Sequence, residues 1–186
     1  MCGRYQSWIE DDELVRIVDR EKKGSSQVYF QREEICPGMQ SPVLYGGSIC
    51  VRARIGTWGY PTEKDGKGKL IFNARAETAA SKALFRDDIV SGRLVVPASG
   101  YYEWNGKQKY RIGSGVLYLA GLGKWVENTQ RYVILTTEPT AQIRTIHDRM
   151  PLLLTRDEVE KWLYDEAFCR RKLVNGTSIV LHAESV

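Results

Sequence analysis

Residues 101–104 and 107–112 form two runs of alternating side chains on either side of the dipeptide Asn105-Gly106. Asn-Gly between such runs is a strong hairpin signal, because a type I′ turn requires positive φ at both central residues. A two-residue loop pairs Trp104 with Lys107 and Glu103 with Gln108. The chain is therefore expected to contain antiparallel β-structure around this turn.

Side chains alternate across a strand, so Tyr101 and Glu103 are expected on one face of this hairpin, with Tyr102 and Trp104 on the other. Much of the remaining chain shows short apolar runs separated by glycine or polar turns. The predicted strands, in addition to the hairpin, cover residues 42–45, 49–55, 94–96, 116–122, 132–137 and 178–181.

Helical signals are fewer. Ser7-x-x-Glu10 and Thr155-x-x-Glu158 both have the form of a capping box, and each precedes an amphipathic pattern. A third, short helix is predicted over residues 81–89. The pattern indicates an α+β fold that is rich in β-structure and has peripheral helices.

Length and composition favour one domain that spans residues 1–186. The 186 residues are 42% hydrophobic, which suffices for one well-filled core. No apolar run is long enough to cross a bilayer, and the acidic stretch 10–13 does not fit a signal peptide. We therefore expect a cytoplasmic protein that does not bind membranes, associated with the nucleoid if the source is bacterial.

The charge and the cysteines exclude little and indicate no metal. A net charge of +4 is only mildly basic and does not by itself argue for nucleic acid. Cys2, Cys36, Cys50 and Cys169 show no C-x-x-C spacing, so neither a zinc site nor a disulfide framework is predicted. The last three are interpreted as reduced structural residues.

Cys2 follows the initiator methionine in the opening Met1-Cys2-Gly3-Arg4-Tyr5. A small side chain at position 2 normally permits removal of Met1, which leaves Cys2 with an α-amine and a thiol on adjacent carbons. The pKa values of such groups lie near ~7.7–8.0 and ~8.5, so both have a reactive form at neutral pH. Together they can condense with an aldehyde, first as an imine and then as a thiazolidine. The alternative is a small buried hydrophobic residue.

The stretch Asn73-Ala-Arg-Ala-Glu-Thr78 follows the apolar run 70–72 and leaves a predicted strand end. The Asn73 amide can donate to an oxyanion or a sugar oxygen, and Arg75 can hold a phosphate through two parallel hydrogen bonds. The alternative is that Asn73 caps a turn while Arg75 and Glu77 form a surface pair.

Glu103 lies among aromatic residues in Val96-Pro-Ala-Ser-Gly-Tyr-Tyr-Glu-Trp104. Loss of solvation would raise the pKa of its carboxyl and suit it to general acid or base chemistry. The alternative is an exposed glutamate opposite Gln108. Trp104 can stack on a base or simply cover the hairpin.

His147 stands in Ile146-His-Asp-Arg-Met-Pro151, beside Asp148 and Arg149. A histidine next to these charges can carry protons, and the arginine can contact phosphate. A structural histidine is the alternative. The other histidine, His182, has no such neighbours and is assigned no role.

Four motifs in order, Cys2-Gly-Arg-Tyr, Asn73-Ala-Arg-Ala-Glu-Thr, Pro97-Ala-Ser-Gly-Tyr-Tyr-Glu-Trp and His147-Asp-Arg-Met-Pro, resemble the SOS response-associated peptidase (SRAP) family of abasic-site processing proteins. The resemblance spans almost the whole chain. It implies a single SRAP domain with a β-rich, barrel-like core, which binds single-stranded DNA and links covalently to abasic sites through the processed Cys2. The linkage would shield the lesion during the DNA damage response.

The resemblance also implies roles for individual residues. Cys2 is the double nucleophile, Asn73 positions the opened sugar, and Glu103 and His147 move protons. Residues implied to contact DNA are Arg4, Arg75 and Arg149 at phosphates, Trp58 and Trp104 as stacking or wedging groups, and Pro37 in a loop near the site. Core packing is the alternative for Trp58. Nucleophilic addition and proton transfer need no metal or cofactor, and the protein is expected to act as a monomer.

Two other functions remain open at this stage. One is an N-terminal-nucleophile cysteine peptidase that processes itself or other peptides, and the other is a single-strand-binding module without chemistry. They differ in their need for Cys2: the covalent sensor requires its amine and its thiol, the peptidase requires the thiol, and the binding module requires neither.

Overall fold

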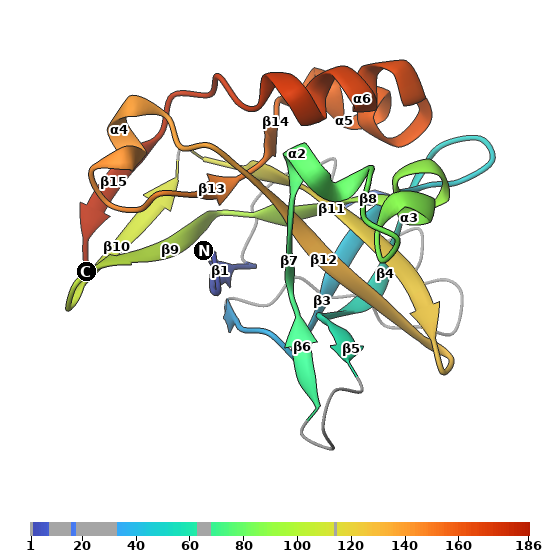
Figure 1. The fold of residues 1–186 in the computed structure, drawn as a ribbon, viewed down its shortest axis with the longest axis horizontal. Helices are drawn as coiled ribbons and strands as arrows, with labels where there is room; N and C mark the ends of the chain where they lie inside the picture. Colours follow the sequence, from blue (N-terminus) through green and yellow to red (C-terminus); the bar gives the residue numbers. More distant parts are fainter. Residues whose placement is uncertain (1, 8–15, 18–32, 63–67, 114) are drawn as a thin grey trace.

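Five strands close on one another to form a barrel in the computed structural model, which describes residues 2–7, 16–17, 33–62, 68–113 and 115–186 (Figure 1). Antiparallel pairing joins β4 to β3, β3 to β8, β8 to β11 and β11 to β12. A parallel contact between β12 and β4 closes the ring. The barrel strands are β3 (Gln40–Gly46), β4 (Val51–Trp58), β8 (Arg93–Ala98), β11 (Leu117–Val126) and β12 (Thr129–Thr137).

A five-stranded sheet packs against the barrel. Its order is β15 (His182–Ser185), β10 (Gln108–Gly113), β9 (Gly100–Asn105), β1 (Tyr5–Gln6) and β2 (Glu34–Ile35). The first residues of the chain lie beside β9, because Tyr5 pairs with Tyr101. This pairing brings the N-terminal segment next to the Glu103 strand.

The consecutive apolar residues of the barrel strands are explained by burial on both faces. Along β8, Leu94 and Val96 belong to the core shared with the five-stranded sheet, whereas Val95 belongs to a second core under the helices. On β12, Tyr132 belongs to the core shared with the five-stranded sheet and Val133 to the core under the helices. Alternation of period two therefore operates inside runs that look uniformly hydrophobic.

Short helices cover the second core. They are α2 (Ala76–Ala79), α3 (Arg86–Ser91), α5 (Arg156–Tyr164) and α6 (Glu166–Asn175), with α4 (Ala141–Arg144) near the five-stranded sheet (Figure 1). None of the helices in the described ranges is long and apolar enough to cross a membrane.

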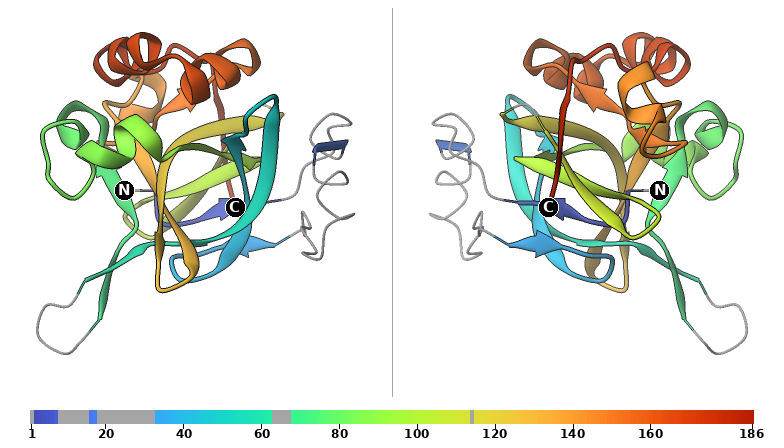
Figure 2. Two further views of the ribbon diagram at one scale, coloured as in Figure 1. Left: turned by 90° about the vertical axis from the view of Figure 1, so that its right-hand side faces the viewer. Right: turned by 90° about the vertical axis from the view of Figure 1, so that its left-hand side faces the viewer.

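The remaining strands are short. β7 (Asn73–Arg75), β13 (Met150–Pro151) and β14 (Leu153–Leu154) pair with barrel strands. β5 (Tyr60–Thr62) and β6 (Lys69–Ile71) form a separate pair that extends away from the barrel (Figure 2).

The predicted fold class and the central hairpin are confirmed, but the loop lies one residue further along the chain than predicted, so each cross-strand partner differs from the predicted one by two residues. Asn105 pairs with Gln108, so the loop is Gly106-Lys107 and Glu103 lies opposite Tyr110. Positive φ occurs at Gly106 and not at Lys107. Positive φ at only the first central residue is typical of a type II′ turn, which needs glycine at that position. Asn105 therefore ends the strand.

Two other element predictions are corrected. The helix predicted over residues 81–89 begins only at Arg86, because residues 80–85 form turns. The strand predicted over residues 178–181 is absent, and the last strand begins instead at His182, which pairs with Gly113. The helix predicted from Ser7 lies largely outside the described residues.

The capping box at Thr155 is confirmed. The Glu158 carboxylate accepts a hydrogen bond of 3.0 Å from the Thr155 backbone N–H, and α5 begins at the next residue. This bond satisfies one of the backbone donors that a helix start leaves unpaired.

Candidate functional site

Cys2 lies near the start of the chain, three positions before the first residue of β1, and is fully buried. Its thiol donates to the Arg4 carbonyl oxygen at 3.7 Å. Burial raises the pKa of the Cys2 thiol well above its ordinary value, and the negative charge of Glu103 raises it further. The sulfur is therefore a neutral thiol at physiological pH.

Asn73 holds the backbone of Cys2. Its side-chain amide Nδ2 donates to the Cys2 carbonyl oxygen at 2.7 Å. A carbonyl only accepts, so the nitrogen must face Cys2 and Oδ1 must point elsewhere. Asn73 begins β7, whose parallel pairing with Ile134 of β12 fixes the direction of the side chain.

Glu103 is buried, with 3% of its surface exposed. Burial raises the pKa of its carboxyl to about 7, although the positive charge of the N-terminal amine lowers it; the charge of Asp148 makes a smaller contribution in the same direction as burial. A carboxyl with such a pKa can both accept and donate a proton near neutral pH. The alternative of an exposed glutamate opposite Gln108 is therefore excluded by its burial and its register.

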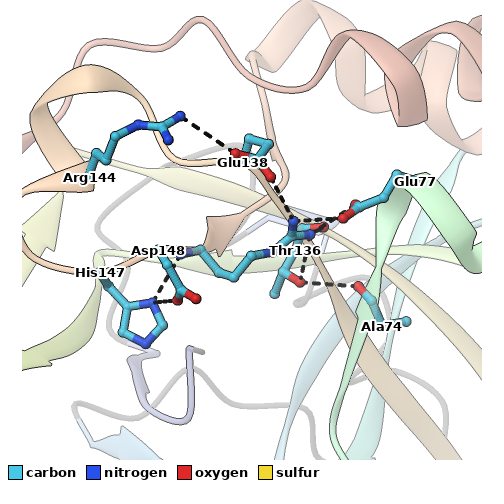
Figure 3. Close-up of polar contacts among 8 residues, drawn as sticks. Ala74, Glu77, Thr136, Glu138, Arg144, His147 and Asp148 are labelled. Atoms are coloured by element: carbon cyan, nitrogen blue, oxygen red, sulfur yellow. Dashed lines mark hydrogen bonds and ion pairs between the residues drawn. The ribbon is translucent and has the colours of Figure 1, made fainter.

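His147 lies beside Glu103, with 3.8 Å between its Nε2 and Glu103 Oε2. The ring Nδ1 accepts a hydrogen bond of 3.0 Å from the Arg149 backbone N–H. Burial lowers the pKa of His147, so the ring is neutral and carries its proton on Nε2, facing Glu103. Asp148 Oδ1 lies 2.8 Å from Nδ1 and can accept a hydrogen bond from it only when Nδ1 carries a proton (Figure 3).

The structure thus connects four motifs that are far apart in the sequence. Asn73 bonds the Cys2 backbone, the Glu103 charge acts on the Cys2 thiol, and His147 lies beside Glu103. The arrangement combines a thiol with an amide donor and two groups that exchange protons near neutral pH. Such a set can add a nucleophile to a carbonyl and move the protons that this addition requires.

Arg149 has a different environment from the one expected for a phosphate contact. Its guanidinium donates to both carboxylate oxygens of Glu77, at 2.7 and 2.9 Å, and to the Thr136 carbonyl oxygen at 2.7 Å (Figure 3). Glu138 lies 3.6 Å from it. The side chain is 8% exposed, and these bonds tie the segment after His147 to α2.

Trp58 also lies in the core rather than on the surface. It is fully buried, its indole N–H donates to the Phe72 carbonyl oxygen at 2.8 Å, and its ring stacks on Tyr132. Trp58 is therefore not exposed for stacking on DNA in this structure. The structure shows the alternative, core packing. Trp104 is 37% exposed.

Arg4 and Trp104 form a surface cluster with two residues that the motifs do not indicate. The Glu34 carboxylate bonds Arg4 Nη1 and Lys109 Nζ, each at 2.7 Å. Both cations lie over the Trp104 ring, at 5.6 and 5.8 Å from its centroid. We call Arg4, Glu34, Trp104 and Lys109 the rim cluster. Pro37 is half-buried and Arg75 is exposed.

Sequence reasoning could have found only part of this rim cluster. The hairpin predicts that Lys109 shares the strand next to Trp104, but no local signal points to Glu34, which reaches them through the pairing of β1 with β2. Tyr101, another residue of the site, shares the face of Glu103 by simple alternation.

No part of the described chain groups three His, Cys, Asp or Glu side chains as a metal site would. A cavity of about 350 Å³ lies elsewhere, and its lining includes Tyr45, Arg54, Lys124, Trp125 and Tyr164 but none of the motif residues. Cys2, Glu103 and His147 combine shifted pKa values with mutual proximity, so we place the functional site around them.

Comparisons with known proteins show which family this sequence matches. Residues 1–180 match the family model described as "SOS response associated peptidase (SRAP)". The chain is 32% identical over 179 residues to Abasic site processing protein YoaM of Bacillus subtilis, covering 88% of this chain and 79% of that protein. It is 28% identical over 181 residues to Abasic site processing protein YedK of Escherichia coli, covering 89% and 81%.

A solved structure shares the fold. A phage-related protein from Bordetella bronchiseptica, known from its crystal structure, superposes with a TM-score of 0.75 at 23% sequence identity, covering 100% of this chain and 94% of that one.

Proposed function

This chain belongs to the SOS response associated peptidase (SRAP) family, and on that premise we propose that it links covalently to abasic sites in single-stranded DNA through Cys2. The relatives named above are abasic site processing proteins. An abasic deoxyribose in its open form carries an aldehyde at C1′, which is the electrophile that an adjacent amine and thiol trap together.

The reaction requires removal of Met1, which leaves the Cys2 amine free. The amine nitrogen adds to C1′, and a proton moves from nitrogen to oxygen to give a carbinolamine. The C1′–O bond then breaks, the oxygen leaves as water, and an imine forms. The Cys2 sulfur adds to the imine carbon while the thiol proton is transferred to the nitrogen, which closes a thiazolidine ring with net loss of one water.

The observation that carries this proposal is the position of Glu103 and His147 beside a buried Cys2. The thiol is neutral and must lose its proton as the ring closes. A carboxyl whose pKa is about 7 can accept this proton, and the neutral imidazole 3.8 Å away can exchange it. Asn73 holds the Cys2 carbonyl at 2.7 Å, which orients the reacting residue.

The same pKa argues against a cysteine peptidase as the main function. A peptidase cysteine attacks as a thiolate and is therefore found where positive charge lowers its pKa. Here burial and a neighbouring carboxylate raise the pKa of the Cys2 thiol. In thiazolidine formation the amine attacks first, so a neutral thiol is no obstacle to the initial step.

The DNA strand would run over the rim cluster. Trp104 offers an exposed aromatic face, and Arg4 and Lys109 supply positive charge beside it. A stacking surface next to cations is typical of proteins that bind single strands without reading sequence. Arg75 is exposed at the start of α2 and is a further phosphate contact.

The test is to mix protein lacking Met1 with single-stranded DNA that contains one abasic site, and to separate the denatured products on a gel. A shifted band is expected with wild-type protein, and no stable band with Cys2→Ala or with DNA whose bases are intact. Cys169→Ala is a matched control, because Cys169 is also a buried cysteine but belongs to the core under the helices. Absence of a band from folded protein with a free Cys2 amine contradicts the proposal.

A further inference from the structure

Tyr101 is a fully buried residue of β9. It pairs with Tyr5 on one side and with Ile112 on the other. Because strand side chains alternate, its ring points to the same face of β9 as Glu103. The ring belongs to the core that also contains Cys2.

The hydroxyl of Tyr101 accepts or donates no hydrogen bond within the described part of the chain. Other buried tyrosines are partnered: Tyr5 and Tyr132 share a hydroxyl–hydroxyl bond of 2.6 Å, and Tyr60 donates to Asp88 at 2.9 Å. A buried polar group without a partner costs about 1–3 kcal/mol of stability. Tyr101 is thus an exception that the fold does not explain.

The surroundings of this hydroxyl are those of the functional site. The charges of Cys2 and Glu103 both act on it electrostatically. A second buried atom without a partner among the described residues, Asn73 Oδ1, belongs to the amide that holds Cys2. Two unsatisfied polar groups in one reactive site indicate that a bound molecule provides their partners.

Tyr101 keeps a proton that it can donate in a hydrogen bond to an oxygen bound in this site. Burial raises the pKa of its phenol well above the ordinary value, with the Cys2 and Glu103 charges adding to the effect. The phenol therefore keeps its proton at physiological pH. A neutral donor stabilises an oxygen on which negative charge develops, without itself releasing a proton.

We propose that the Tyr101 hydroxyl is a further catalytic group, which donates a hydrogen bond to the oxygen on C1′ of the abasic sugar. This inference rests on the proposed function. The bond forms as the Cys2 amine adds to C1′, when the carbonyl electron pair moves onto that oxygen. It persists while the C1′–O bond breaks: the oxygen takes a second proton from the Glu103 and His147 pair and leaves as water, and the pair regains a proton from the nitrogen as the imine forms. Tyr101 ends the step with its own proton.

Tyr101→Phe tests the proposal, because it removes only the hydroxyl. Under single-turnover conditions the maximal rate of cross-link formation should fall about tenfold to a hundredfold. The DNA concentration at half-maximal rate, and the affinity for strands with intact bases, should not change. The melting temperature should stay equal or rise, because an unpartnered buried hydroxyl has been removed.

Tyr132→Phe is the matched control. It removes a buried hydroxyl that has a partner, Tyr5, at 2.6 Å, so it should lower the melting temperature and leave the rate of cross-linking unchanged. A melting temperature that falls in Tyr132→Phe but not in Tyr101→Phe separates a structural hydroxyl from a catalytic one.

The outcomes are distinguishable. A wild-type protein that forms no cross-link refutes the proposed function itself. A wild type that cross-links while Tyr101→Phe cross-links at the same rate refutes only the role of Tyr101. Loss of stability or of folding in Tyr101→Phe, comparable with or greater than that in Tyr132→Phe, identifies the hydroxyl as structural and also overturns this inference.

Discussion

The Asn73 side chain and the Cys2 backbone are joined by a hydrogen bond of 2.7 Å, across 71 positions of the sequence. The bond connects the N-terminal segment to the start of β7. Through it, the direction of the reactive residue depends on the parallel pairing of β7 with β12. An N-terminal residue is usually among the least ordered parts of a chain, and this contact keeps Cys2 in place.

Replacing Asn73 by alanine should slow cross-linking at least about tenfold while the protein stays folded, because misplacement of a reacting group is costly in rate. Single-turnover gels and a thermal melt measure the two effects. Asn105→Ala is the control, since Asn105 makes the same kind of bond, to the Thr145 carbonyl oxygen at 3.0 Å, outside the site. Equal rates in the two variants would refute the positioning role of Asn73.

Glu103 should make the stability of the protein dependent on pH. Its pKa is raised from 4.5 to about 7 on folding, so the folded state binds more protons between these values. Stability therefore falls as pH rises from about 4.5 to 7, by up to about 3 kcal/mol from this residue, and is constant above that range. Protonated Glu103 is the form that the fold favours.

Glu103→Gln removes this titration, and its melting temperature relative to wild type should therefore be higher at pH 8 than at pH 5. Melts at the two pH values measure the difference, in which the other titrating groups cancel. A difference that does not depend on pH would mean that the pKa of Glu103 is not raised. Cross-linking by this variant should be slow at both pH values.

Truncation of Trp104 should affect DNA binding, whereas truncation of Trp58 should affect stability. Trp104→Ala should weaken binding to single-stranded DNA by about 1–3 kcal/mol, the usual value of one base stacked on an aromatic ring, with little change in melting temperature. Trp58→Ala should instead destabilise the fold by about 3–5 kcal/mol, because a large buried side chain is lost. Fluorescence anisotropy and thermal melts separate them. Unaltered affinity in Trp104→Ala would exclude stacking at this position.

Glu34 should oppose DNA binding, because its carboxylate forms ion pairs with both cations of the rim cluster, Arg4 and Lys109. Hydrogen bonds from Lys109, and then from Arg4, lower the pKa of Glu34, so it is ionised at neutral pH. Glu34→Gln should therefore bind single-stranded DNA more tightly. The slope of log affinity against log salt should become steeper by about 0.7 for each additional phosphate contacted.

Glu184→Gln is the matched control for Glu34. Glu184 pairs with Arg111 at 3.1 Å at the opposite side of the same sheet, on β15. Titrations at several salt concentrations should show no change in this variant. If Glu34→Gln binds no more tightly than Glu184→Gln, the rim cluster is not a phosphate-binding surface.

The sequence allowed the local part of the fold to be predicted. The alternation around Asn105-Gly106 predicted the central hairpin and the shared face of Tyr101 and Glu103, and the Thr155 capping box predicted α5. The register was wrong because the turn conformation depends on φ at Gly106 and Lys107, and both conformations are compatible with the same dipeptide.

Contacts between segments that are far apart in the chain could not be predicted from the sequence. Nothing local in the sequence indicates that Arg149, expected at a phosphate, bonds Glu77 seventy-two positions away. The sequence likewise allows Trp58 to be an exposed wedge or a core residue. In the structure, β4 pairs with β12, and Trp58 is buried beside Tyr132. The family motifs pointed to Cys2, Asn73, Glu103 and His147 as site residues, which stays a prediction. That the Tyr101 hydroxyl has no partner among the described residues can be seen only in the structure.

The most direct test of a thiazolidine at Cys2 is the intact mass of the protein–DNA adduct, measured with and without borohydride. Thiazolidine formation predicts the summed mass of Met1-processed protein and DNA less one water, and no change on reduction, because the ring contains no C=N bond. Cys2→Ala, which keeps the amine alone, should yield an adduct only when borohydride traps the imine by adding two hydrogens. A wild-type adduct that gains two hydrogens, or one that forms equally well while Met1 is retained, would contradict the proposed linkage.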